Sequence, residues 1–141
     1  MRPTTLAQTY ERIIAGEACE TALSEFLDTF YLAPSPERRL DTLRQQPPLT
    51  GDARLDALAG GAAEYLARQY GLPSIPDWAF EPVRYLERPW HTSPFDDPGM
   101  REYLTFASPA EFASRNIFTE ERPLRRARAH MAKSLAPTEV E

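Results

Sequence analysis

The chain has 141 residues, of which 42% are hydrophobic, and its 16 basic and 21 acidic side chains give a formal net charge of -5. This length is typical of one domain with one core, and the negative balance repels a phosphate backbone, so any contact with nucleic acid has to be local. With one cysteine and with no apolar stretch near the roughly 20 residues of a spanning helix, we expect a cytoplasmic protein without membrane contact.

The first half of the chain has the pattern of helices separated by proline and glycine. Thr4 or Thr5 can cap a first helix, and Gly16 can end it. Apolar residues at three- and four-residue steps then predict a second helix from Glu17 to about Leu32. Cys19 lies on the apolar stripe of this helix, so we interpret it as a packing residue rather than a reactive thiol.

A short third helix is predicted by its two ends. Ser35 can cap it and Pro36 suits its first position, whereas Pro47 and Pro48 prevent its continuation. The stretch from Glu25 to Leu43 could also be a helix-turn-helix whose second helix carries Arg38, Arg39 and Arg44. The same pattern describes an ordinary pair of antiparallel helices, which we favour.

The fourth helix is predicted within "LTGDARLDALAGGAAEYLARQYG" and is the longest in the chain. Gly71 can take the left-handed conformation that ends it. Its interior contains Gly60 and Gly61, each of which costs about 1 kcal/mol relative to alanine. They require either close packing against a neighbouring segment or a local break, and we favour close packing.

Prolines dominate the next segment. Six of them lie between Leu72 and Pro98 and exclude long helices there. Pro98 can open another helix that runs through Phe106, and "SPAE" at 108–111 matches a capping box for a short helix that ends near Asn116. We find no alternating run long enough for a strand, and "NIF" at 116–118 is too short to predict a sheet.

These elements predict an all-α fold, a compact bundle of about five to six helices wrapped by a proline- and aromatic-rich irregular segment. We expect a single helical domain over residues 1–121. Residues 122–141 are then a basic C-terminal tail, too poor in large apolar residues to hold a core, and we expect it to be frayed or disordered.

The irregular segment also holds most of the aromatic residues. Nine of the fifteen lie in this part of the chain: Trp78, Phe80, Tyr85, Trp90, Phe95, Tyr103, Phe106, Phe112 and Phe118. Rings bury about 150 to 250 Å² each, so they can anchor irregular backbone to a core, and stiff aromatic loops also suit protein interfaces. Both interpretations stay open, and we expect Trp90 and Phe118 to be partly exposed because polar residues flank them.

The candidates for chemistry are few. Cys19, His91 and His130 are too few nitrogen and sulfur ligands for structural zinc, and the glycines form no phosphate-binding loop. No nucleophile, base and oxyanion binder occur as a set. A small enzyme that uses His91 with Asp96 or Asp97 is a third hypothesis, but we expect a protein without catalytic activity, cofactor or metal.

The tail contains a basic cluster, made up of Arg122, Arg125, Arg126, Arg128 and Lys133. Such a cluster can contact phosphates of RNA or DNA, or an acidic groove of a protein, and it can also be only a solvated tail. Nucleic-acid binding through these residues is the alternative function.

Five stretches, "TYERIIAGE", "ALSEFLDTFY", "EYLARQYGLPSIPDW", "ERPWH" and "SPAEFASRNIF", give residues 7–118 a resemblance to a group of small uncharacterised all-helical bacterial proteins. Some of these are encoded beside nucleotidyltransferase-like toxin genes. The resemblance implies an antitoxin-like or regulatory protein that works through a partner, such as the product of a neighbouring gene, and it carries over no catalytic residue.

A non-enzymatic protein that binds another protein is therefore the leading hypothesis. We place its partner-binding surface in the aromatic segment, on Trp90, His91, Arg115, Asn116 and Phe118.

Overall fold

The computed structural model describes residues 4–93 and 97–124. The described chain is mostly helical, which confirms the predicted all-α class. Its elements are α1 (Leu6–Ile14), α2 (Cys19–Leu32), α3 (Pro36–Arg44), α4 (Ala53–Gln69), the 3₁₀ helices η1 (Asp77–Phe80) and η2 (Pro82–Arg84), β1 (Trp90–His91), α5 (Pro98–Ala107), α6 (Ala110–Ala113) and β2 (Ile117–Phe118). None of the helices in these two ranges has the length and apolar content needed to cross a membrane.

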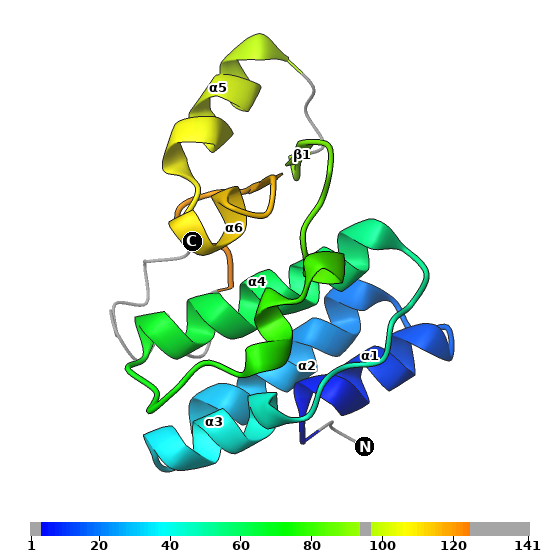
Figure 1. The fold of residues 1–141 in the computed structure, drawn as a ribbon, viewed down its shortest axis with the longest axis vertical. Helices are drawn as coiled ribbons and strands as arrows, with labels where there is room; N and C mark the ends of the chain where they lie inside the picture. Colours follow the sequence, from blue (N-terminus) through cyan, green and yellow to red (C-terminus); the bar gives the residue numbers. More distant parts are fainter. Residues whose placement is uncertain (1–3, 94–96, 125–141) are drawn as a thin grey trace, which may run out of the picture.

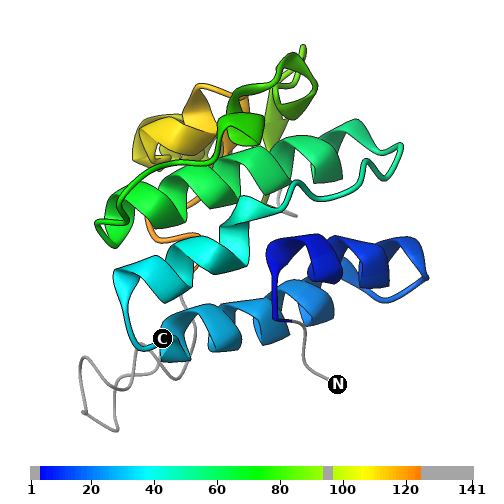
Figure 2. The same ribbon diagram turned by 60° about the horizontal axis from the view of Figure 1, so that its bottom comes forward.

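The helices are arranged in layers around α4. Helices α1, α2 and α3 lie on one side of α4, and η1, η2 and α6 lie on the other side (Figures 1 and 2). Helix α5 stands at the end of the molecule, away from α1–α3 (Figure 1). The bundle and the irregular segment that wraps it thus share α4 as their common support.

Helix α4 is buried on most of its circumference. Its buried positions are Asp56, Ala57, Ala59, Gly60, Gly61, Ala62, Ala63, Glu64, Leu66 and Ala67. The small residues among them let neighbouring segments approach from both sides. A helix with packed layers on two sides needs small residues on more than one face.

The two interior glycines of α4 confirm the prediction of close packing. A Cβ added to Gly60 would lie 2.7 Å from Arg84 Cβ and 3.0 Å from the carbonyl oxygen of Ala79. A Cβ added to Gly61 would lie 2.8 Å from the ring of Phe112. The helix continues through both residues without a break.

The helix ends follow the predicted chemistry in the first half of the chain. The Thr5 hydroxyl caps α1 by accepting a hydrogen bond from the Gln8 N–H, and the Ser35 hydroxyl caps α3 in the same way with Arg38. Gly71 follows α4 with φ +64°, the left-handed conformation expected of it.

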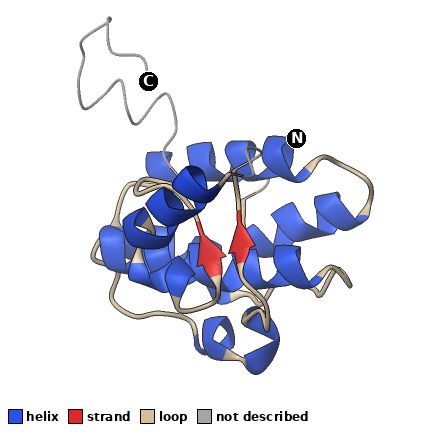
Figure 3. Ribbon diagram, turned by 90° about the horizontal axis from the view of Figure 1, so that it is seen from above, coloured by secondary structure: helices blue, strands red, loops and turns tan. Residues whose placement is uncertain are grey.

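The second half departs from the predictions at Ser108 and at the strands. Ser108 does not cap α6, since its hydroxyl accepts from the Thr119 N–H and shares its one proton between the carbonyl oxygens of Leu104, at 2.7 Å, and Thr119, at 2.9 Å. The capping box was therefore wrong. A short sheet was also missed, because Trp90 pairs with Ile117 and His91 with Phe118 in a parallel ladder (Figure 3).

The packed chain continues past the expected domain end at residue 121. Leu124 belongs to the hydrophobic core, and its carbonyl accepts a hydrogen bond of 2.7 Å from the Tyr31 hydroxyl. The rest of the predicted tail, residues 125–141, lies outside the described residues.

Candidate partner-binding surface

Helix α5 is held to the molecule by little of its own surface. Asp97 caps it by accepting a hydrogen bond from the Met100 N–H, and Pro98 occupies its first turn. Of its residues only Leu104 is buried. Phe106 is 82% exposed and Tyr103 is 50% exposed. We call these two rings the α5 face.

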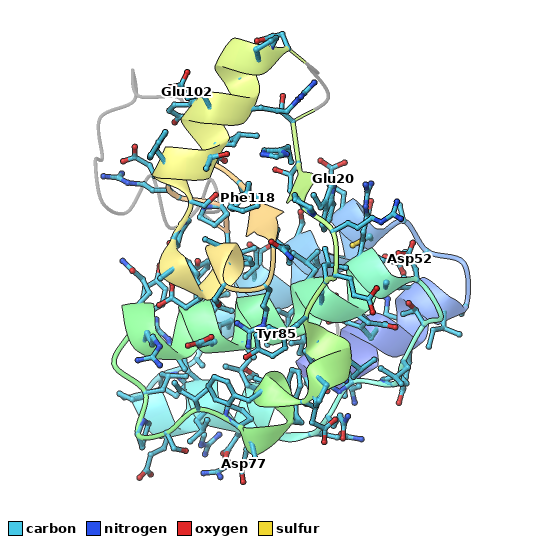
Figure 4. The ribbon with its side chains drawn as sticks, turned by 45° about the horizontal axis from the view of Figure 1, so that its top comes forward. Glu20, Asp52, Asp77, Tyr85, Glu102 and Phe118 are labelled. Atoms are coloured by element: carbon cyan, nitrogen blue, oxygen red, sulfur yellow. The ribbon has the colours of Figure 1, made fainter. Side chains whose placement is uncertain are left out.

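A histidine links α5 to the short sheet. The His91 ring stacks on the Phe118 ring with centroids 5.0 Å apart, and its Nε2 lies 3.2 Å from Thr105 Oγ1. The Thr105 hydroxyl donates its own proton to the Arg101 carbonyl, so its oxygen is placed to accept from an N–H at Nε2 of His91. Phe118 belongs to strand β2, where Figure 4 labels it. His91 and Phe118 are half-buried. Through the contact of His91 with Thr105 they connect α5 to the short sheet.

Trp90 and Asn116 stand at the base of the same region. Trp90 is half-buried, packs against the core, and lies under the Arg54 guanidinium at 5.2 Å. Asn116 takes the left-handed conformation, with φ 65°, and its side-chain amide donates to the Leu86 carbonyl at 2.8 Å. The partial exposure predicted for Trp90 and Phe118 is confirmed.

Arg115 does not belong to this surface. Its side chain is 0% exposed, and its Nη1 lies 2.6 Å from a carboxylate oxygen of Glu64. It also donates to the carbonyls of Glu111 and Ala79, and its guanidinium lies 4.5 Å from the ring centroid of Tyr85. The prediction of a partner contact is corrected here, because Arg115 ties α6 to α4 inside the protein.

The basic candidates divide between the described residues and the rest. Arg122 is exposed, whereas Arg125, Arg126, Arg128 and Lys133 lie outside the described residues. On α3, Arg39 donates to the carbonyls of Phe30 and Tyr31 at the end of α2. It is half-buried and joins two helices, which supports the pair of packed helices, whereas Arg38 and Arg44 on the same helix are exposed.

The hypothesis of an enzyme gains no catalytic arrangement. Asp97 caps α5, and Asp96 lies outside the described residues. Within 4–93 and 97–124, His, Cys, Asp and Glu side chains form no group of three or more that could hold a metal. Cys19 is half-buried, and burial raises the pKa of its thiol, which opposes thiolate reactivity.

A shallow groove of about 420 Å³ lies at the far end of the bundle, where the start of α1 meets α2 and α3. It is lined by Thr5, Thr29, Leu32 and Thr42, among others. The three hydroxyls hydrogen-bond to nearby backbone atoms. Thr5 therefore caps α1, and Thr29 and Thr42 bond back to carbonyls of their own helices.

The sequence-based choice of residues missed the two most exposed rings. Tyr103, Leu104 and Phe106 all lie in the helix that the sequence predicts from Pro98 through Phe106. Positions 103, 104 and 106 cannot all share one narrow face of a helix, so part of this set had to point outward. This spacing was the signal in the sequence that some of these side chains are exposed.

Comparisons with models of protein families, with curated proteins and with solved structures found no match to this chain.

Proposed function

We propose that this protein binds another protein through the α5 face and the adjoining half-buried residues Trp90, His91, Asn116 and Phe118, and that it performs no reaction itself. The observation that carries this proposal is the 82% exposure of Phe106. Exposed aromatic rings that lie close together are typical of interfaces, where they supply much of the binding energy.

The way the surface is held supports the same function. His91 and Phe118 stack, Thr105 bonds to His91, and Leu104 anchors α5 from beneath. A ring presented on a positioned helix loses less conformational entropy on binding than one on an unstructured loop. The α5 face is therefore arranged before a partner arrives.

The specific version of this proposal is an antitoxin-like or regulatory role, as the sequence resemblance implies. The partner is then the protein product of a neighbouring gene. In the test, this product is purified separately and mixed with the chain. Co-elution in size-exclusion chromatography and a calorimetric titration measure the complex.

The decisive variant is Phe106→Ser. Loss of a central ring at an interface costs about 2 kcal/mol or more, so we expect affinity to fall by about 30-fold or more. The matched control is Ile14→Ser, which also removes an exposed apolar side chain, at 52% exposure, but from α1. No complex with the neighbouring product, or an equal loss of affinity in both variants, contradicts the proposal.

A further inference from the structure

Strand β1 has an open edge. The N–H groups of Trp90 and Thr92 donate to backbone carbonyls of the β2 segment at 2.8 and 3.0 Å. Because backbone groups alternate in direction along a strand of a parallel ladder, the N–H and the C=O of His91, which lies between these two residues, point away from β2. Neither group has a hydrogen-bond partner within residues 4–93 and 97–124.

The opposite edge of the sheet is closed. Ile117 of β2 is 0% exposed, and the N–H and C=O of Thr119, which follows β2, both bond to the Ser108 hydroxyl at 2.6 and 2.9 Å. Strand β2 also packs against α6, whereas β1 contacts chiefly β2 and α5 among the described elements. Figure 3 shows the two strands side by side. Of the two edges in the described chain, only the edge of β1 can therefore accept a further strand.

The open edge presents a short, ordered set of backbone groups. The Pro89 C=O points opposite to the Trp90 N–H and thus away from β2, and it has no hydrogen-bond partner in the part of the chain that the structure describes. Along the edge, the sequence of groups is an acceptor at Pro89, a donor at His91 and a second acceptor at His91. One residue of a parallel strand can donate its N–H to Pro89 and accept from the His91 N–H, and the N–H two residues later reaches the His91 carbonyl.

The side chains of β1 indicate which residues fit beside this edge. Trp90 packs against the core, with the Arg54 guanidinium over its ring, whereas the next side chain, His91, lies on the side of α5 and stacks on Phe118. Side chains of neighbouring strands contact each other in pairs across the sheet. The edge therefore fits an extended segment that has no proline among its paired residues and has an apolar or aromatic residue beside Trp90.

We infer that the partner binds by adding such an extended segment to β1 as a third strand of the sheet. This inference rests on the proposed function in taking another protein as the partner, and it assigns the mode of binding. In strand addition, main-chain hydrogen bonds supply affinity and alternate side chains supply specificity. Because α5 contacts β1, the added strand continues the surface that we assign to partner binding.

Amide hydrogen exchange, measured by NMR on the full chain alone and saturated with the neighbouring gene product, tests the inference. In the chain alone, the His91 amide should exchange about tenfold faster or more than the amides of Trp90 and Thr92, which bond to the β2 segment. In the complex, exchange at His91 should slow by about tenfold or more, because its N–H gains a partner. Trp90 and Thr92 are internal controls and should change less.

Two variants test the same donor by affinity. His91→Ala and His91→Pro both remove the imidazole ring, but only proline removes the N–H. Edge strands accept proline where the N–H faces solvent, so urea denaturation should give similar stabilities for the two variants. The proline variant should bind the neighbouring gene product about tenfold more weakly than the alanine variant, because a carbonyl of the added strand is left without its donor.

Several results overturn the inference. Slow exchange at His91 in the chain alone would show that the edge is already covered, and exchange that slows as the chain alone is concentrated would make the occupant a second copy. Unchanged exchange at His91 in the saturated complex, or equal affinities of the two variants, would exclude strand addition by the partner. If one of these results occurs while Phe106→Ser still weakens the complex, the proposed function stands and only the mode of binding is wrong. The absence of any complex contradicts both.

Discussion

Two regions of the molecule treat large side chains differently. Around Gly60 and Gly61 such side chains are buried, whereas on α5 they are exposed. At the glycines, Arg84, Arg115 and Phe112 are buried against α4. At α5, aromatic rings of the same irregular segment face solvent. The aromatic-rich segment is therefore only partly core, because the segments that each part contacts decide whether its rings are buried.

The difference depends on how closely other segments can approach the backbone of each helix. The two glycines let the Arg84 backbone and the Phe112 ring approach α4 closely, so large side chains there fill space that a Cβ would occupy. Helix α5 has no such partner among the described elements and contacts mainly the two-residue strands. Its remaining faces are not covered by the residues that the structure describes.

Among the variants that test this contrast, Arg115→Met is expected to have the largest effect on the free energy of unfolding. The change leaves the buried carboxylate of Glu64 without its closest partner, and breaking a buried ion pair costs about 3 to 5 kcal/mol of unfolding free energy. Urea denaturation measures it. The control is Arg68→Met, because Arg68 bonds to the same carboxylate with a side chain that is 55% exposed. We expect the control to cost less than about 1 kcal/mol, and similar costs for the two variants would contradict the assignment.

The next effect concerns the glycines themselves. Gly60→Ala should lower the unfolding free energy by about 1 to 3 kcal/mol, since its methyl group would collide with Arg84 and the Ala79 carbonyl. Gly99→Ala, in the exposed first turn of α5, should instead be neutral or stabilise by up to about 1 kcal/mol. Thermal unfolding of both variants checks the difference. A stabilising Gly60→Ala would show that the packing at α4 is loose.

The sequence predicted the elements whose cause is local. The caps at Thr5 and Ser35 and the left-handed Gly71 depend on residues within one turn, and all three are present. Ser108 had an equally good local pattern, but the Thr119 backbone, eleven residues away, competes for its hydroxyl. Local rules fail where a distant segment offers a better partner.

The site was harder to predict for the same reason. Arginine is usually exposed, and no residue next to Arg115 in the sequence signals its burial. Its burial depends on Glu64, 51 residues earlier in the chain, and on the space left beside Gly60. The parallel pairing of Trp90 with Ile117 is likewise a contact between distant segments. Neither contact has a signature in a single stretch of sequence.

A smaller effect on stability, seen only at high pH, is expected from Tyr10, a buried residue of α1. Burial raises the pKa of Tyr10 well above its usual value, and its hydroxyl donates to the Leu55 carbonyl. Below pH 10 the phenol is protonated in both the folded and the unfolded chain, so it contributes no pH dependence. Above pH 10 only the unfolded chain releases this proton, so stability falls by about 1.4 kcal/mol per pH unit for this group.

Chemical denaturation between pH 9 and about pH 11 measures that slope. In Tyr10→Phe the slope should be smaller by the share of one phenol, although the variant also loses a hydrogen bond and is less stable at every pH. An unchanged slope would mean that Tyr10 is accessible to solvent in the folded chain.

The smallest effect on stability is expected at the α5 face. Phe106→Ala removes a ring that is 82% exposed, so the unfolding free energy should change by less than about 1 kcal/mol. Phe112→Ala removes a ring that is 1% exposed and packs against Gly61, and it should cost about 3 to 5 kcal/mol. The two variants delete the same atoms from the same segment, so urea denaturation of both compares the two environments directly. If Phe106→Ala costs as much as Phe112→Ala, α5 is part of the core, and the surface assigned to partner binding does not exist.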